Sequence, residues 1–153
     1  MKKIILNIAF LLISVVSFGQ HNKSVDIESK IQNIIQNNTF VPETKNGTLI
    51  DDNGKEINHN TSFYFFLDTE KLFSVLYEQH DEISLNKTYY YDNDQLVLVV
   101  IEKINNKASK DRIAEQIFYF YDNGELIDSS DYTAKYVPTE LYTEGMNYLK
   151  DFN

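Results

Sequence analysis

The chain has 153 residues, of which 23 are acidic and 14 basic, giving a formal net charge of −9, and it contains no Cys and no Trp. The missing cysteines exclude a disulfide scaffold and thiol chemistry, and the acidic balance argues against nucleic-acid and anionic-membrane partners. With 10 Phe and 11 Tyr but only 5 Gly and 2 Pro, the composition indicates one globular domain rather than a disordered chain.

The first 19 residues have the three-part layout of a secretory signal peptide. Lys2 and Lys3 precede an apolar run over 4–16, and the Ser-Phe-Gly sequence at 17–19 supplies the small residues of a cleavage site. The apolar run is shorter than a membrane span of about 20 residues, and no Cys is present to accept a lipid. We therefore expect residues 1–19 to be a signal peptide and 20–153 to be one secreted α+β domain, periplasmic or released, that is not a lipoprotein and has no transmembrane anchor after cleavage.

Two helices are expected, one at each end of the exported chain. Ile residues at positions 27, 31, 34 and 35 share one face, which predicts an amphipathic helix over 25–36 with Ser24 as its N-cap. Pro138 and Thr139 mark the start of a second helix, whose apolar stripe continues to Phe152. Gly145 lies inside this second helix, where glycine is unfavourable, so we expect the helix to approach the sheet closely there.

Three segments repeat a hairpin signature of three aromatic or apolar residues, an Asp, a three-residue turn and a Leu. They are FFLDTEKL at 65–72, YYYDNDQL at 89–96 and YFYDNGEL at 119–126. Asp, Asn and Gly favour turns, and the flanking residues favour strands. Each segment therefore predicts one β-hairpin.

The spacing of these turns predicts an antiparallel meander. Its strands are expected near 48–51, 55–58, 62–67, 71–78, 86–91, 95–102, 113–121 and 125–130. The predicted fold class is α+β: a curved antiparallel β-meander of about six to eight strands with an N-terminal and a C-terminal helix packed on it. Several strands are apolar on both faces, so we expect the second face to be covered by the second helix, by closure of the sheet or by another molecule.

Signatures of catalysis and metal binding are weak. The three His residues lack the spacing of metal ligands, and neither a G-x-S-x-G elbow nor a phosphate-binding Gly motif occurs. We expect no metal, no cofactor and no identifiable catalytic residue. Four Asn-x-Ser/Thr sequons are interpreted as incidental, and they begin at Asn37, Asn46, Asn60 and Asn86.

Tyrosines are the candidate binding residues. An exposed aromatic face could stack on sugars or pack against a protein, because tyrosine is both rigid and amphipathic. The six candidates are Tyr89, Tyr91, Tyr119, Tyr121, Tyr132 and Tyr136. The same residues suit strand cores and sheet margins equally well, so both interpretations stay open.

The Lys2-Lys3 signal that ends in Ser17-Phe18-Gly19-Gln20, the Ile-rich helix and the units YYYDNDQL and FYFYDNGEL resemble those of a group of small exported Gram-negative bacterial proteins of unknown function. That group carries an N-terminal helix followed by tandem Tyr-rich hairpins of the form Y-x-Y-D-N-G-x-L. The chain departs from its commoner forms in lacking a lipobox Cys and in having Asp94 where the turn Gly is expected. The resemblance implies Gram-negative export and no particular activity.

Three functions are compatible with the sequence. We favour a non-catalytic secreted or periplasmic binding or interaction module that uses an uncovered aromatic sheet face to hold a protein or a glycan. One alternative is a small carboxylate-dependent hydrolase or lyase with a cleft in the curved sheet, since 23 acidic residues allow a catalytic pair. The other is a homo-oligomeric structural envelope protein that associates through the same face.

Overall fold

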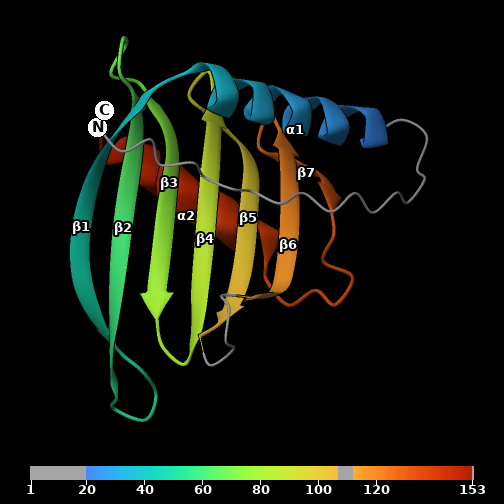
Figure 1. Cartoon of the computed structure of the whole chain (residues 1–153). Helices are drawn as coiled ribbons and strands as arrows, with labels where there is room; N and C mark the ends of the chain where they lie inside the picture. Colours follow the sequence, from blue (N-terminus) through green and yellow to red (C-terminus); the bar gives the residue numbers. More distant parts are fainter. Residues whose placement is uncertain (1–19, 107–111, 153) are drawn as a thin grey trace.

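The computed structural model describes residues 20–106 and 112–152, which form a sheet with two helices (Figure 1). The elements in chain order are α1 (Gln20–Asn37), β1 (Phe40–Ile50), β2 (Glu56–Phe66), β3 (Leu72–His80), β4 (Ile83–Asp92), β5 (Gln95–Asn105), β6 (Arg112–Asp122), β7 (Glu125–Ser129) and α2 (Pro138–Lys150). The seven strands lie in one sheet in chain order, each antiparallel to the next. The predicted α+β meander with two terminal helices is confirmed. The predicted signal peptide, residues 1–19, lies outside the described residues.

The two helices pack on opposite faces of the sheet. On one face, which we call the α1 face, Ile31 of α1 is buried in a cluster with Tyr90 and Leu98. On the other, the α2 face, Leu141 and Leu149 of α2 close a larger cluster. Figure 1 shows α1 crossing in front of the sheet near one end of the strands and α2 passing behind it. The strands are therefore apolar on both faces because each face packs against a helix.

The hairpin repeat is confirmed: the turns of its last two units are shorter than the sequence indicated, and the first unit, between β2 and β3, has a longer loop. Asp92 pairs with Gln95 and Asp122 with Glu125, so both loops contain two residues rather than three. Both residues of each loop have positive φ, at 49° and 60° for Asn93 and Asp94 and at 50° and 85° for Asn123 and Gly124. Two successive positive φ values define the tight turn that matches the twist of a hairpin, and Asn, Asp and Gly tolerate that conformation best.

The Asp residues of the last two repeat units also hold α1. Lys30 Nζ lies 2.5 Å from a carboxylate oxygen of Asp92, and Lys23 Nζ lies 2.6 Å from one of Asp122. The two lysines are seven residues apart, which places them on the same side of the helix two turns apart. The repeated hairpins thus present matched carboxylates to the helix that crosses them.

Three sequence predictions of local structure were wrong. The expected strands at 55–58 and 62–67 are one strand, β2, and the first strand begins at Phe40 rather than near 48. Ser24 lies inside α1, which begins at Gln20, and its hydroxyl donates a 2.7 Å hydrogen bond to Asp128 instead of capping the helix. The predicted start of the second helix is confirmed, since Pro138 is the first residue of α2 and follows Val137 at the N-cap.

The expected close approach at Gly145 is confirmed. Gly145 is buried in α2, and a Cβ atom built on it would lie 2.7 Å from a methyl group of Leu96 and 2.8 Å from the ring of Tyr89. Only glycine lets the helix backbone come this near to the sheet. In residues 20–106 and 112–152, neither helix is long and apolar enough to cross a membrane.

Candidate functional site

The structure places the six predicted binding tyrosines mainly in the core. Tyr89, Tyr91, Tyr119 and Tyr121 are at most 2 % exposed, all within the cluster on the α2 face. Tyr136 is half-buried and packs against the same cluster, and Tyr132 is 77 % exposed. The sequence left open whether these tyrosines are core residues or surface residues. The first four are core residues. They offer no surface to a ligand in this fold.

Two of the buried tyrosines form hydrogen bonds with the backbone of α2, which covers them. Tyr91 donates a 2.7 Å hydrogen bond to the carbonyl oxygen of Gly145, and Tyr121 donates a 2.8 Å bond to that of Pro138. The Tyr89 hydroxyl is buried without a hydrogen-bond partner among the described residues. Burial raises the pKa of each of these three tyrosines, so they stay neutral at physiological pH.

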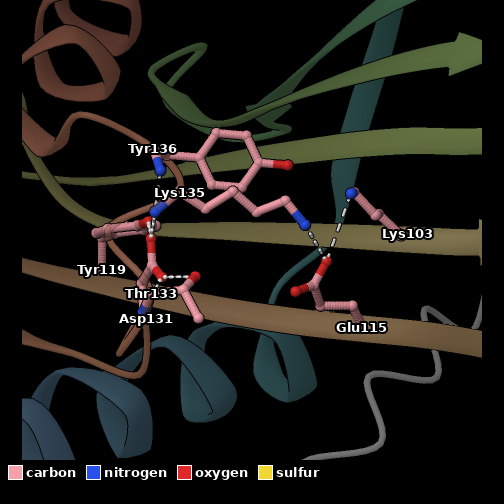
Figure 2. Close-up of polar contacts among 7 residues, drawn as sticks. All are labelled: Lys103, Glu115, Tyr119, Asp131, Thr133, Lys135 and Tyr136. Carbon is pink, nitrogen blue, oxygen red and sulfur yellow. Dashed lines mark hydrogen bonds and ion pairs between the residues drawn. The ribbon is translucent and has the colours of Figure 1, made fainter.

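Tyr119 and Tyr136 meet in a polar cluster around Asp131, in the connection from β7 to α2 (Figure 2). One Asp131 carboxylate oxygen accepts hydrogen bonds from the Tyr119 hydroxyl and from the backbone N–H groups of Lys135, at 2.9 Å, and Tyr136, at 3.3 Å. The other accepts the Thr133 hydroxyl at 2.8 Å and the Thr133 N–H at 3.0 Å. Five donors on one carboxylate make Asp131 the anchor of this loop.

The electrostatics of the cluster support a structural role. The bond from Tyr119 and those from Thr133 and Tyr136 hold the pKa of Asp131 well below its ordinary value. Beside it, Glu115 accepts ion pairs from Lys135 at 2.8 Å and from Lys103 at 3.5 Å, as Figure 2 shows. Each charge is matched and the Asp131 acceptors are occupied, so this cluster has little capacity left for a ligand.

A second set of polar residues lies on the α1 face, beyond the end of the sheet that α1 covers. Strand pairing places one side chain from each of β1 to β6 directly opposite the next. We call this set the polar row, and it consists of Asn46, Asn60, Glu78, Asn86, Glu102 and Gln116. Five inter-strand spacings give it a length of about 24 Å.

The polar row is partly organised by its own contacts. Gln116 donates a 2.8 Å hydrogen bond to Glu102, and the Asn60 amide lies 3.0 Å from the ring nitrogen of His80. Burial raises the pKa of Glu102, with the bond from Gln116 acting in the opposite direction. Burial and then the charge of Glu78 raise the pKa of Tyr64. The two carboxylates of the row are thus half-buried and lack a neighbouring cation in the row.

Beside the polar row, on the side of α1, lies a less polar row in the same register. It consists of Thr44, Ser62, Leu76, Thr88, Val100 and Phe118. Val100 and Phe118 belong to the cluster that packs against α1. The α1 face therefore changes from apolar at the helix to hydrogen-bonding at the polar row.

The lysines of the strands lie on the opposite side of the sheet. Lys45 Nζ is 4.4 Å from the ring centroid of Phe152, and Lys87 Nζ is 2.8 Å from Glu144 of α2. Lys103 is paired with Glu115. Each of these lysines is next in sequence to a member of the polar row, and the alternation of side chains along a strand places it on the other face. The polar row offers amides and carboxylates and no positive charge.

No known protein family, curated protein or solved structure matches this chain.

Neither of the two best-formed hollows in the described part of the chain touches the polar row. One, of about 490 Å³, is lined by residues of α2 between Thr139 and Asn147. The other, of about 210 Å³, lies where the end of α1 meets the β2–β3 and β4–β5 turns. Among residues 20–106 and 112–152, no group of three or more His, Asp or Glu side chains is placed to hold a metal ion.

Sequence reasoning missed the polar row. Asn46, Asn60 and Asn86 drew attention only as sequons, and Glu78, Glu102 and Gln116 drew none. The available signal was period-two spacing, since on three strands, β3, β5 and β6, an apolar residue lies two positions from the polar one and nearer to α1. Their alignment depends on the register of five strand pairs, which a single sequence does not reveal.

Proposed function

We propose that this protein is an exported, non-catalytic binding module that holds a neutral glycan chain along the polar row. The observation that carries the proposal is the alignment of six amide and carboxylate side chains on a part of the sheet that neither helix covers. The export part of the proposal is supported by the sequence of residues 1–19.

The chemistry of the polar row favours a polyhydroxylated ligand. Asn and Gln side chains both donate and accept, and carboxylates accept strongly, so together they complement hydroxyl groups, which also do both. Their half-buried setting reduces the number of competing water contacts. Leu76 and Phe118 in the adjoining row are only partly buried, and they offer apolar surface to the C–H groups of a sugar ring.

The absence of basic residues from the row argues against an anionic ligand. A sulfated or uronic-acid glycan would be repelled by Glu78 and Glu102 and would find no lysine or arginine among the row members. The composition of the row fits a protein partner less well, because the residues that contribute most to protein interfaces are Trp, Tyr and Arg, and the row has none of them. A neutral glycan fits both observations.

A binding screen with neutral oligosaccharides, followed by titration calorimetry, tests the proposal. Asn86→Ala and Glu78→Gln, both in the middle of the polar row, are expected to weaken binding several-fold, since one hydrogen bond contributes about 1 kcal/mol. Gln79→Ala is the matched control, because Gln79 follows Glu78 on β3 but lies on the α2 face. It is expected to leave the affinity unchanged.

Two outcomes would oppose the proposal. Equal affinities for the wild type and both row variants would remove the polar row as the binding surface. Release of shorter sugars that stops in Glu78→Gln or Glu102→Gln would instead favour the carboxylate-dependent hydrolase, since these two acids flank Asn86 on neighbouring strands.

A further inference from the structure

β1 forms an open edge of the sheet. It is eleven residues long, pairs only with β2 and is exposed along nearly its whole length. Figure 1 shows it at the outer margin of the sheet. The opposite edge differs, because β7 has only five residues and α1 is bonded to it through Ser24 and Asp128. Long open edges are sites where another strand can add.

Two backbone hydrogen bonds define which groups of β1 point outward. Asp51 donates to the carbonyl of Lys55 and Leu67 donates to that of Thr39, both at 3.0 Å, and these bonds lie at opposite ends of the β1–β2 pair. Because bonding alternates along an antiparallel strand, the odd-numbered residues of β1 bond to β2 and the even-numbered residues point their N–H and C=O groups away. The outward positions are Phe40, Pro42, Thr44, Asn46, Thr48 and Ile50.

Pro42 blocks only one of these outward positions. It has no N–H group, and proline is found in sheets at just such edge sites. The other outward residues keep both groups, so the edge can still pair with a partner strand, with one backbone N–H bond missing wherever Pro42 is paired.

We propose that this edge pairs with β1 of a second copy of the chain, antiparallel, with Thr44 opposite the partner's Thr44. In that register Glu43 lies opposite the partner's Lys45, and Lys45 opposite the partner's Glu43, on the α2 face. Opposite charges directly across a strand pair are stabilising, and like charges are destabilising. The strand is complementary to itself in this register.

The neighbouring registers are disfavoured by the same charges. In the two neighbouring registers that keep outward residues opposite each other, Thr44 lies opposite either the partner's Pro42 or the partner's Asn46. The first brings Glu43 against the partner's Glu43, and the second brings Lys45 against the partner's Lys45. The charge pattern therefore selects one register out of three. Lys45 is also held in place, since its Nζ lies 5.1 Å from the ring centroid of Phe63 and 4.4 Å from that of Phe152.

The pairing has a consequence for the surface of the molecule. An antiparallel pair of identical strands is related by a two-fold axis perpendicular to the sheet, so both α1 faces lie on the same side. The two polar rows then face one direction, and the dimer would bind bivalently to a surface that carries repeated ligands. The dimer proposal does not depend on the ligand of the polar row.

Sedimentation equilibrium of the purified protein tests the pairing, at concentrations from about 10 μM to about 1 mM, because a single strand pair makes a small and therefore weak interface. We expect a monomer–dimer equilibrium that weakens with added salt. Glu43→Lys should raise the dissociation constant about tenfold, since it replaces two attractive pairs by two repulsive ones. The double variant Glu43→Lys, Lys45→Glu should restore dimerisation, because the charges are again opposite.

Glu125→Lys is the matched control, because it makes the same charge change at an exposed site on β7, at the other edge of the sheet. It is expected to leave the dissociation constant unchanged, and thermal unfolding of each variant verifies that it is folded. A monomer at every concentration would overturn the proposal. So would a dimer whose dissociation constant is the same in the wild type and in Glu43→Lys.

Discussion

Gln116 donates a 2.8 Å hydrogen bond to Glu102 across the β5–β6 pair, on the face of the sheet that α1 covers only in part. The bond fixes the orientation of both side chains, and burial raises the pKa of the Glu102 carboxyl. An open surface whose polar groups are already oriented loses less side-chain freedom when a ligand binds. This pre-organisation supports a binding role for the polar row.

Gly145→Ala is expected to destabilise the protein by about 1–2 kcal/mol. The added methyl group would lie 2.7 Å from Leu96 and 2.8 Å from Tyr89, so two side chains must move and the cost falls in the upper half, about 2–3 kcal/mol, of the range for overpacking. The better helix propensity of Ala returns about 1 kcal/mol. Denaturant unfolding measures the difference. Asn147→Ala, at an exposed position of α2, is the control and should change stability by a few tenths of a kcal/mol at most. A Gly145→Ala variant as stable as the wild type would show that α2 does not approach the sheet this closely.

Ile31→Ala should destabilise the protein far more than Lys30→Ala, although the two residues are adjacent on α1. Ile31 is 1 % exposed in the cluster on the α1 face, and truncation of such a residue costs about 2–5 kcal/mol. The Lys30 side chain is half-exposed, and ion pairs of this kind contribute about 1 kcal/mol or less. Urea unfolding of both variants compares the two. Equal losses would mean that the contacts with the hairpin carboxylates, rather than apolar burial, hold α1 on the sheet.

Asp131→Asn is expected to lower the melting temperature at neutral pH and to have a smaller effect in acid. The pKa of Asp131 is depressed in the folded state, so its charge stabilises the fold above the ordinary Asp pKa of about 4 and this contribution is lost as the pH falls below that value. The difference in melting temperature between wild type and variant should therefore shrink between about pH 4 and pH 2. Asp52→Asn, in the exposed β1–β2 turn, serves as the control. A difference that stays constant over this range would contradict the role of Asp131 as a charged anchor of the loop.

Much of the architecture could be predicted from sequence because it depends on local signals. The Ile spacing at 27, 31, 34 and 35 indicates α1, and the Asp-Asn turns indicate the hairpins that make a meander. Gly145 could be interpreted correctly because an unfavourable residue in a helix needs a packing reason. The error in β2 also has a local cause, since the polar run at 58–60 looks like a loop but lies within a strand beyond the region that the helices cover.

The candidate site was not predictable in the same way. Whether Tyr89 or Tyr121 is a core residue or a surface residue depends on which face α2 covers, and that is a tertiary property. The polar row requires that Glu78, Asn86 and Glu102 fall opposite one another, which depends on two strand registers and on the bulge that shifts the β4–β5 register. A single sequence contains the residues but not their alignment.

The most direct test of the polar row as a ligand site is the two-dimensional ¹H–¹⁵N NMR spectrum of the labelled protein, titrated with the neutral oligosaccharide that binds best in the screen. We expect the largest shift changes at Asn60, Glu78, Asn86 and Glu102, in the middle of the row, and little change at the residues of α2. Shift changes confined to α2 or to the loop around Asp131 would contradict this expectation.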